Sequence, residues 1–125
     1  MFSPLTEVGG HLEGAILARR IVDLLADRQA EDILLLDIGK VTLFADYFVI
    51  ASAETTRQMR ALCDALDSEL AKDGITPYGR EGEPDSGWIL LDLGDVIVHI
   101  FAPDERNFYD LEGLYRAATP VVRIQ

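Results

Sequence analysis

Apolar and polar positions follow two different periods along this chain. Between residues 12 and 28, and again between residues 55 and 72, apolar residues recur every three to four positions, which predicts two amphipathic helices. Ser52 and Thr55 are both suited to cap the start of the second helix, and Gly74 is suited to its end. The apolar stripe expected on that helix consists of Met59, Leu62, Cys63, Leu66 and Leu70.

Short apolar runs rich in β-branched and aromatic residues predict strands. They cover residues 32–37, 47–51, 88–93 and 96–102. The last two flank Gly94-Asp95, a pair typical of a type II′ turn, so they should form an antiparallel hairpin. Strands interleaved with helices and joined in part by a hairpin predict an α+β fold. We expect a single mixed sheet of about five strands, with helices packed on it.

The chain ends with a short helical pattern and contains no sign of a second domain. A last helix is expected from about Glu105, with Phe108, Leu111 and Tyr115 on one face. We expect residues 1–11 to form a flexible lead-in, residues 12–115 one domain, and residues 116–125 a tail without an assigned role. No targeting segment precedes the domain and no apolar run approaches the roughly 20 residues of a membrane span, so a cytoplasmic protein is expected.

The predicted hairpin fixes which side chains share a face of the sheet. One face is wholly aliphatic, with the cross-strand pairs Leu93–Val96, Leu91–Val98 and Ile89–Ile100. The other is mixed, with the pairs Asp92–Ile97, Leu90–His99 and Trp88–Phe101. A half-apolar surface with an aromatic anchor and polar neighbours is typical of recognition sites. The alternative is that the last helix covers this face.

Charge narrows the class of partner. The chain has 22 acidic and 11 basic residues and a net charge of −11, which repels nucleic-acid backbones and favours a basic partner. Extensive nucleic-acid binding is therefore not expected, although the charge is equally compatible with a role in solubility alone. The single cysteine, Cys63, excludes an intrachain disulfide and a cysteine-based zinc site.

The candidates for catalysis are carboxylates near strand ends. Asp37, Asp46, Asp92 and Asp95 would suit a metal-dependent nucleotidyl or phosphoryl transferase. Aspartates at strand ends are also common turn formers. His99, in a strand between valine and isoleucine, is more typical of a structural residue than of a catalyst. We assign no catalytic residue, metal site or cofactor, and expect the protein not to be an enzyme.

Four runs of residues, in one order, resemble one protein family. They are Ala45-Asp46-Tyr47-Phe48-Val49-Ile50, Trp88-Ile89-Leu90-Leu91-Asp92, the hairpin segment from Gly94 to Phe101, and the segment from Arg106 to Tyr115. With Glu81-Gly82 shortly before the tryptophan, this order is similar to that of the ribosomal silencing factors, also called the Iojap family. The resemblance extends from about Leu12 to Tyr115.

The resemblance implies a nucleotidyltransferase-like fold without that superfamily's catalytic Gly-Ser and paired aspartates. It implies a translational repressor that binds the large ribosomal subunit through its fourteenth protein, a basic protein at the intersubunit face. Bound there, it would block joining of the small subunit when nutrients are scarce. Trp88 matches the tryptophan that the family places on its ribosomal partner. We extend the predicted partner-binding set to Leu90, Asp92, Asp95, His99 and Phe101, with Leu93 included if the turn of the hairpin is the contact.

Two alternatives stay open from the sequence. One is the metal-dependent nucleotidyltransferase-like enzyme described above. The other is a plain homodimerisation module, in which the Trp88 face pairs with its own copy. The second alternative is compatible with ribosome binding, because the family resemblance also makes a homodimer plausible.

Overall fold

Strands β2 (Tyr47–Ser52) and β5 (Val96–Phe101) lie in the middle of the fold, and every residue of both is buried. Such apolar strands can be accommodated only where both faces of a sheet are covered. They pair in parallel, with Val49 beside Val98. The computed structural model describes residues 4–125, with side chains from residue 13 onward.

Four further strands complete one six-stranded sheet with the order β3-β4-β5-β2-β1-β6. They are β1 (Glu31–Asp37), β3 (Gly79–Glu81), β4 (Trp88–Asp92) and β6 (Thr119–Ile124). All neighbours other than β2 and β5 are antiparallel, which confirms the predicted mixed sheet, with six strands in place of about five.

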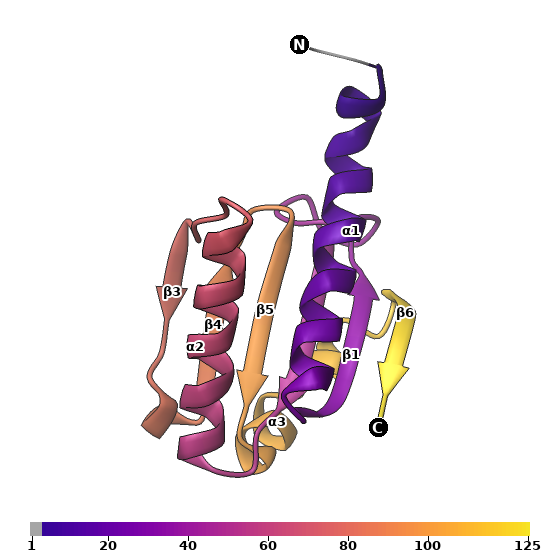
Figure 1. Ribbon diagram of the computed structural model, residues 1–125. Helices are drawn as coiled ribbons and strands as arrows, with labels where there is room; N and C mark the ends of the chain where they lie inside the picture. The colour runs from indigo at the N-terminus through magenta and orange to yellow at the C-terminus, as the bar shows by residue number, and fades with distance from the viewer. Residues whose placement is uncertain (1–3) are drawn as a thin grey trace.

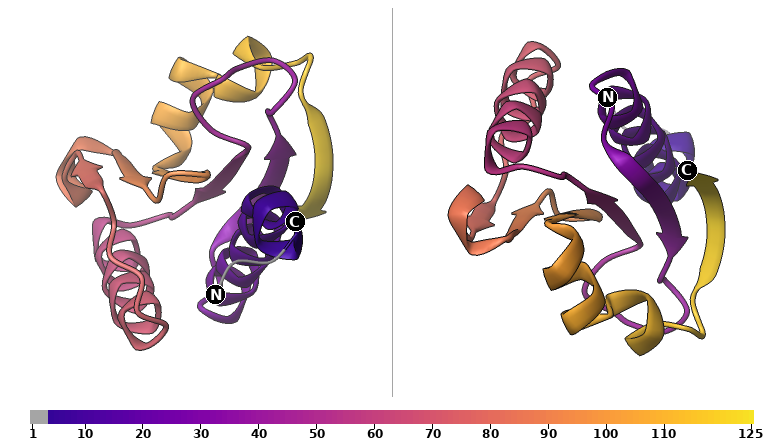
Figure 2. Two further views of the ribbon diagram at one scale, coloured as in Figure 1. Left: turned by 90° about the horizontal axis from the view of Figure 1, so that it is seen from above. Right: turned by 90° about the horizontal axis from the view of Figure 1, so that it is seen from below.

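The helices divide between the two faces of the sheet (Figures 1 and 2). They are α1 (Pro4–Asp27), α2 (Thr56–Lys72), the 3₁₀ helix η1 (Pro84–Ser86), α3 (Pro103–Tyr109) and α4 (Leu111–Leu114). Figure 2 shows α1 and α2 on one side and α3 and α4 on the other. Within residues 4–125, no helix is both long and apolar enough to cross a membrane.

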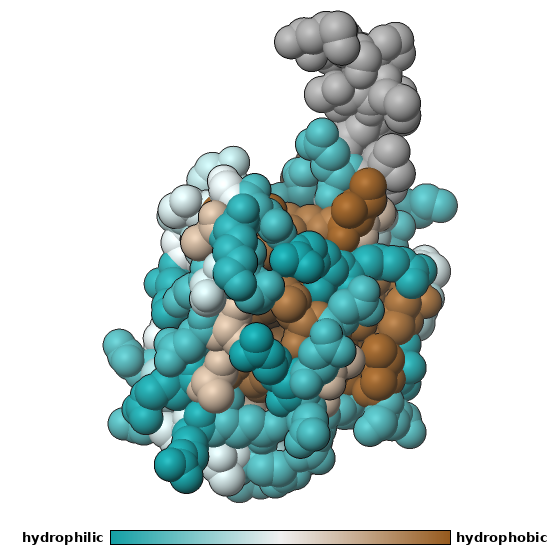
Figure 3. All heavy atoms as spheres, in the orientation of Figure 1, coloured by the Kyte–Doolittle hydropathy of each residue, from teal (hydrophilic) through white to brown (hydrophobic). Residues whose placement is uncertain are grey.

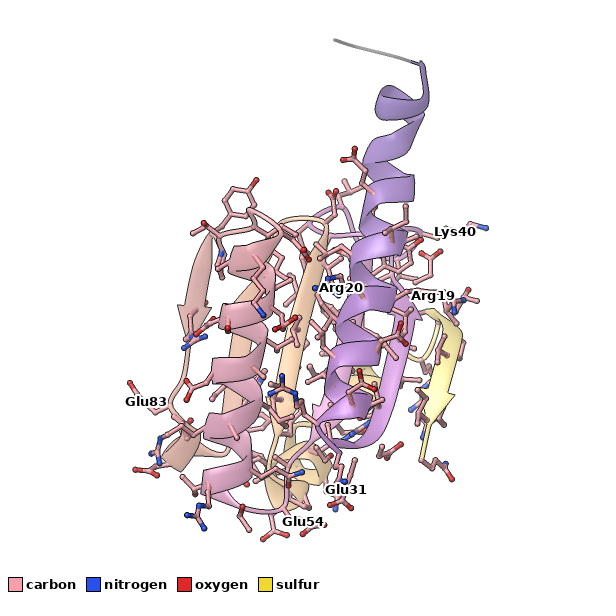
Figure 4. The ribbon with its side chains drawn as sticks, viewed as in Figure 1. Arg19, Arg20, Glu31, Lys40, Glu54 and Glu83 are labelled. Carbon is pink, nitrogen blue, oxygen red and sulfur yellow. The ribbon has the colours of Figure 1, made fainter. Side chains whose placement is uncertain are left out.

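The predicted aliphatic face lies beneath α1 and α2. Ile89, Leu91, Val98 and Ile100 are buried there with the predicted stripe of α2, including Cys63. Figure 3 shows the outer side of this layer, where hydrophilic side chains predominate and hydrophobic ones appear in the hollow between the two helices. Figure 4 shows Arg20 of α1 in that hollow; it forms salt bridges with Glu69 and Asp73.

The hairpin has the predicted register. Trp88 lies opposite Phe101, Leu90 opposite His99 and Asp92 opposite Ile97. Gly94 has a φ of 87°, a left-handed conformation that favours glycine and that a type II′ turn needs at its first central position.

Several segments differ from the sequence-based expectation. Helix α1 begins at Pro4 instead of residue 12. Proline is compatible with this start because it is tolerated in a first helical turn. The first turns of α1 extend past the sheet (Figure 1). The predicted tail contains β6, which pairs with β1. The final helix is broken into α3 and α4 at Asp110, whose φ is 46°, so Phe108 is exposed while Leu111 is buried. The side chain of His11, the other histidine of the chain, lies outside the residues whose side chains the structure describes.

A buried arginine joins the final helices to the sheet. Arg106 of α3 donates to the Ser52 hydroxyl at 2.8 Å and to the Asp32 carbonyl at 2.6 Å. Its Nε and Nη2 donate to the Glu112 carboxylate, each at 3.1 Å. Arg123 of β6 also reaches Asp32, at 3.2 Å. This network fixes α3 and α4 against the ends of β1, β2 and β6.

Replacing Arg106 should therefore destabilise the fold. The Arg106→Met change leaves the Ser52 hydroxyl without this donor and leaves the Glu112 carboxylate with only its 3.9 Å contact to Arg123, and we expect the free energy of unfolding to fall by about 3 kcal/mol or more. Urea denaturation followed by circular dichroism measures this. The matched control is Arg116→Met, because exposed Arg116 donates only to the Gly113 carbonyl. Equal stabilities of the two variants would contradict the role given to Arg106.

Candidate partner-binding site

Trp88 opens β4 on the face of the sheet opposite α1 and α2. Side chains alternate along this strand, so Ile89 and Leu91 are buried under α2 whereas Trp88 and Leu90 are only half-buried. The indole stacks on Phe101 with ring centroids 4.9 Å apart, and it contacts Tyr109 of α3 at 4.5 Å. The tryptophan is thus held on two sides and reaches the surface on the rest.

His99 fixes the polar edge of the indole. Trp88 Nε1 donates to His99 Nδ1 at 3.2 Å, so the histidine carries its proton on Nε2. His99 is 3% exposed, and burial lowers its pKa from 6.5 to about 4, which keeps it neutral at pH 7. Among the described residues, Nε2 has no hydrogen-bond partner. Because His99 is buried and accepts the indole N–H, it supports Trp88 from below the surface.

Trp88 borders a shallow groove of about 210 Å³, here called the Trp88 groove, which is lined by Glu81, Gly82, Trp88 and Leu90. Gly82 has a φ of 89°, and a Cβ there would lie 2.0 Å from the Trp88 carbonyl oxygen, so only glycine fits this approach. Figure 4 shows Glu83, next in the chain, projecting from the same edge of the sheet.

Further apolar side chains are exposed on α3, which contacts Trp88, and in the loop before β2. On α3, Phe108 is 80% and Tyr109 is 47% exposed, and their rings meet edge to face. In the loop before β2, Phe44 is 57% exposed and its ring centroid lies 6.1 Å from that of Phe48, which in turn packs on His99. The sequence did not single out Phe44 or Tyr109. It placed Phe108 on one helix face with Leu111, because the break at Asp110 that separates the two residues has no strong signal in the sequence.

The structure divides the predicted partner-binding residues into separate groups. Trp88 and Leu90 line the groove. His99 and Phe101 are 3% and 0% exposed, because α3 and α4 cover the β5 part of this face; both lie beneath the surface beside Trp88, and their part in partner binding stays a prediction. The alternative that the last helix covers the face is therefore right for β5 but not for β4.

The predicted residues near the turn lie elsewhere. Leu93 is 7% exposed and packs with the aliphatic core under the helices. The Asp92 carboxylate accepts the backbone N–H of Gly94 at 2.8 Å, so it shapes the turn. Asp95 lies exposed at the tip, beside a second groove shared with α1, and is not part of the Trp88 groove.

Two of the four strand-end aspartates, Asp37 and Asp92, have structural roles. Asp37 accepts the backbone N–H of Gly39 at 3.0 Å, as Asp92 does for Gly94, and these are the contacts of turn-forming aspartates. Within residues 13–125, no group of three His, Cys, Asp or Glu side chains is placed to hold a metal ion.

Cys63 is buried in the core, where desolvation raises the pKa of its thiol to about 11.

His99 should make stability depend on pH. Its pKa in the folded protein, about 4, is below the unfolded value of 6.5, so the unfolded chain takes up a proton first as the pH falls. Its contribution to stability is complete above pH 6.5 and is lost as the pH falls towards 4, by about 3 kcal/mol in total. Urea denaturation between pH 7 and 4 should show this loss reduced in His99→Phe relative to the wild type. The same pH dependence in the variant and the wild type would contradict it.

The hydrogen bond to His99 should also be visible at Trp88 itself. Trp88 is the only tryptophan of the chain, so the indole N–H gives a single side-chain signal in a ¹H–¹⁵N spectrum. In His99→Phe the acceptor is gone, and we expect this signal to move upfield and exchange faster with solvent. An unchanged signal would show that His99 does not hold the indole.

Comparison with known proteins shows which family this chain resembles in sequence and in fold. Residues 12–125 match the family model described as "Ribosomal silencing factor during starvation". The ribosomal silencing factor of Bacillus subtilis is 42% identical over 89 residues, covering 71% of this chain and 75% of that protein. A crystal structure from Bacillus halodurans has a TM-score of 0.75 at 32% identity and covers 86% of this chain and 98% of that one. A more distant mouse relative, named mitochondrial assembly of ribosomal large subunit protein 1, is 32% identical over 98 residues, which is 76% of this chain and 43% of that protein. The family match covers residues 12–125 and so includes all strands of the sheet. The chain belongs to the ribosomal silencing factor family.

Proposed function

We propose that this protein represses translation by binding the large ribosomal subunit through its fourteenth protein and blocking the small subunit from joining. Nutrient limitation is the condition under which this repression would act. The observation that carries the proposal is the Trp88 groove, an apolar surface on the sheet face that the long helices leave uncovered. Membership of the silencing factor family supplies the class of partner.

The groove has the composition of a binding hot spot. Tryptophan and tyrosine are enriched at such positions, where a rigid ring is partly buried beforehand and loses little entropy on binding. Trp88 is held by Phe101, Tyr109 and His99, so its orientation is set before a partner arrives. Phe108 of α3 and Leu114 of α4 are further apolar side chains exposed on the short helices of this side of the sheet.

Acidic residues surround the groove and favour a basic partner. Glu81 lines it, Glu83 and Asp85 follow in the same segment, and the Glu105 carboxyl lies against Gly87 just before the tryptophan. The net charge of −11 adds a long-range attraction for a basic ribosomal protein.

The proposed mechanism is steric, and no bond is made or broken. A folded domain seated on the intersubunit face occupies the volume that the small subunit needs, so its effect depends on occupancy alone. The nucleotidyltransferase-like alternative gains no support from Asp37 and Asp92, because the carboxylates of both already accept backbone N–H groups.

Truncating Trp88 should remove binding. Trp88→Ala deletes the anchor, and we expect affinity for isolated large subunits to fall by about 2 kcal/mol or more, roughly 30-fold. Co-sedimentation with separated large and small subunits measures this, and circular dichroism establishes that the variant is folded. The wild type should pellet with the large subunit only and reduce assembled ribosomes when the small subunit is added.

The matched control is Tyr78→Ala. Tyr78 is also an exposed aromatic residue, at 81% exposure, but it lies beside the Gly94 turn and not in the Trp88 groove. Its variant should bind like the wild type. A folded Trp88→Ala variant that still pellets would remove Trp88 from the site, and a wild type that pellets with neither subunit would refute the proposed function.

A further inference from the structure

We infer that the Trp88 groove accepts one basic side chain of its partner, a lysine or arginine whose aliphatic stem lies on Trp88 and Leu90 and whose charge meets Glu81. The inference deepens the proposed function and rests on it for the identity of the partner. It is drawn from the four lining residues and from the way the sheet positions them.

The pairing of β3 with β4 places Glu81 on the groove side of the sheet. Glu81 lies opposite Leu90, and directly opposed residues of antiparallel strands have neighbouring side chains on one face. Arg80 precedes it and points to the other face, where it makes two hydrogen bonds to the Asp67 carboxylate, at 2.6 and 2.7 Å. The alternation therefore separates Glu81 from the one basic residue beside it in the sequence. Within residues 13–125, no salt bridge reaches Glu81.

Gly82 brings the backbone that follows Glu81 against the backbone of Trp88. Its backbone passes against the Trp88 carbonyl at a distance that leaves no room for a Cβ, and its φ of 89° turns the chain there. The end of β3 is thus fixed beside the start of β4. Glu81 is placed by the backbone and not by a flexible loop.

The indole itself offers no polar contact to an occupant. Its only N–H is already donated to His99 beneath the surface, so Trp88 presents carbon atoms and the face of its π system. Leu90 adds aliphatic surface and Gly82 has no side chain. Of the four lining residues only Glu81 is charged, so the groove combines an apolar floor with one anionic end.

Lysine and arginine fit this combination best. Each carries an apolar stem that can lie on a hydrophobic surface, and a cation at its end. A cation beside a tryptophan ring gains additional attraction from the π electrons, and arginine also stacks on such rings. An acidic occupant would meet Glu81 and the surrounding Glu83 and Glu105, and a purely aliphatic one would leave the carboxylate buried without a partner.

A peptide titration tests the groove without ribosomes. Acetylated tetra-arginine amide should change the fluorescence of Trp88 saturably, because the sole tryptophan of the chain lies in the groove. Neutral tetra-citrulline, of nearly the same shape, should not. In Glu81→Gln the dissociation constant should rise about tenfold, the range for losing one charge-assisted hydrogen bond.

Asp64→Asn is the matched control, because it removes the same charge from an exposed position on α2, across the sheet from the groove. It should leave the titration unchanged. Equal weakening in both variants would show a general effect of net charge, and an unaltered Glu81→Gln variant would remove Glu81 from the site; either result overturns the inference.

Co-sedimentation separates this inference from the proposed function. Glu81→Gln should bind large subunits about tenfold more weakly than Asp64→Asn, with a smaller dependence on salt. If the wild type pellets and Trp88→Ala does not, but Glu81→Gln pellets like the wild type, the function stands and the basic-side-chain inference fails. If the peptide titration succeeds and the wild type does not pellet, the proposed function fails and the groove chemistry stands.

Discussion

The parallel pairing of β2 with β5 is the constraint on which the rest of the molecule depends. Parallel strands cannot be joined by a tight turn, so the chain has to leave β2, cross the sheet and return before β5. Helix α2 makes that crossing on one face, and β4 then enters as the antiparallel partner of β5. Because β5 is fixed on one side by β2, the register of the hairpin decides that Trp88 meets Phe101 and that Leu90 meets His99. The site is thus a consequence of sheet topology.

Helix length explains why only one face of the sheet is closed. The six strands span roughly 24 Å from edge to edge at about 4.8 Å per step. Helix α3 has seven residues, a length of about 10 Å, and the left-handed residue Asp110 stops it from continuing. The two short helices therefore cover β5 and reach Trp88 only at its edge, through Tyr109. The start of β4 and its neighbour β3 remain uncovered at one edge of the sheet, as β6 does at the other edge.

The sequence predicts the parts of this arrangement that depend on local periodicity. The stripe of α2, the hairpin register and the mixed sheet all follow from apolar spacing and from Gly94. Strands β3 and β6 do not follow from such spacing. All three residues of β3 are exposed, and β6 contains Pro120 and no buried residue, so neither strand has an alternating pattern. The division of the predicted site is a tertiary effect: His99 and Phe101 share a face with Trp88, and only the path of the chain after Pro103 decides which of them α3 covers. From the sequence, Glu81 stood out only in the Glu81-Gly82 pair of the family resemblance, since the short strand β3 that places it at the groove has no periodic signal.

Charge decides between a foreign partner and a second copy of the chain at this surface. A twofold symmetric dimer through the Trp88 groove would bring Glu81 and the nearby Glu83 and Glu105 of one copy towards the same acidic surface of the other. Like charges brought together at an interface cost affinity, whereas a basic partner converts each of them into an attraction. The net charge of −11 also repels a second copy of the chain at long range. An apolar anchor within an acidic rim is therefore better suited to a basic protein than to itself, and this favours ribosome binding over self-association through the groove.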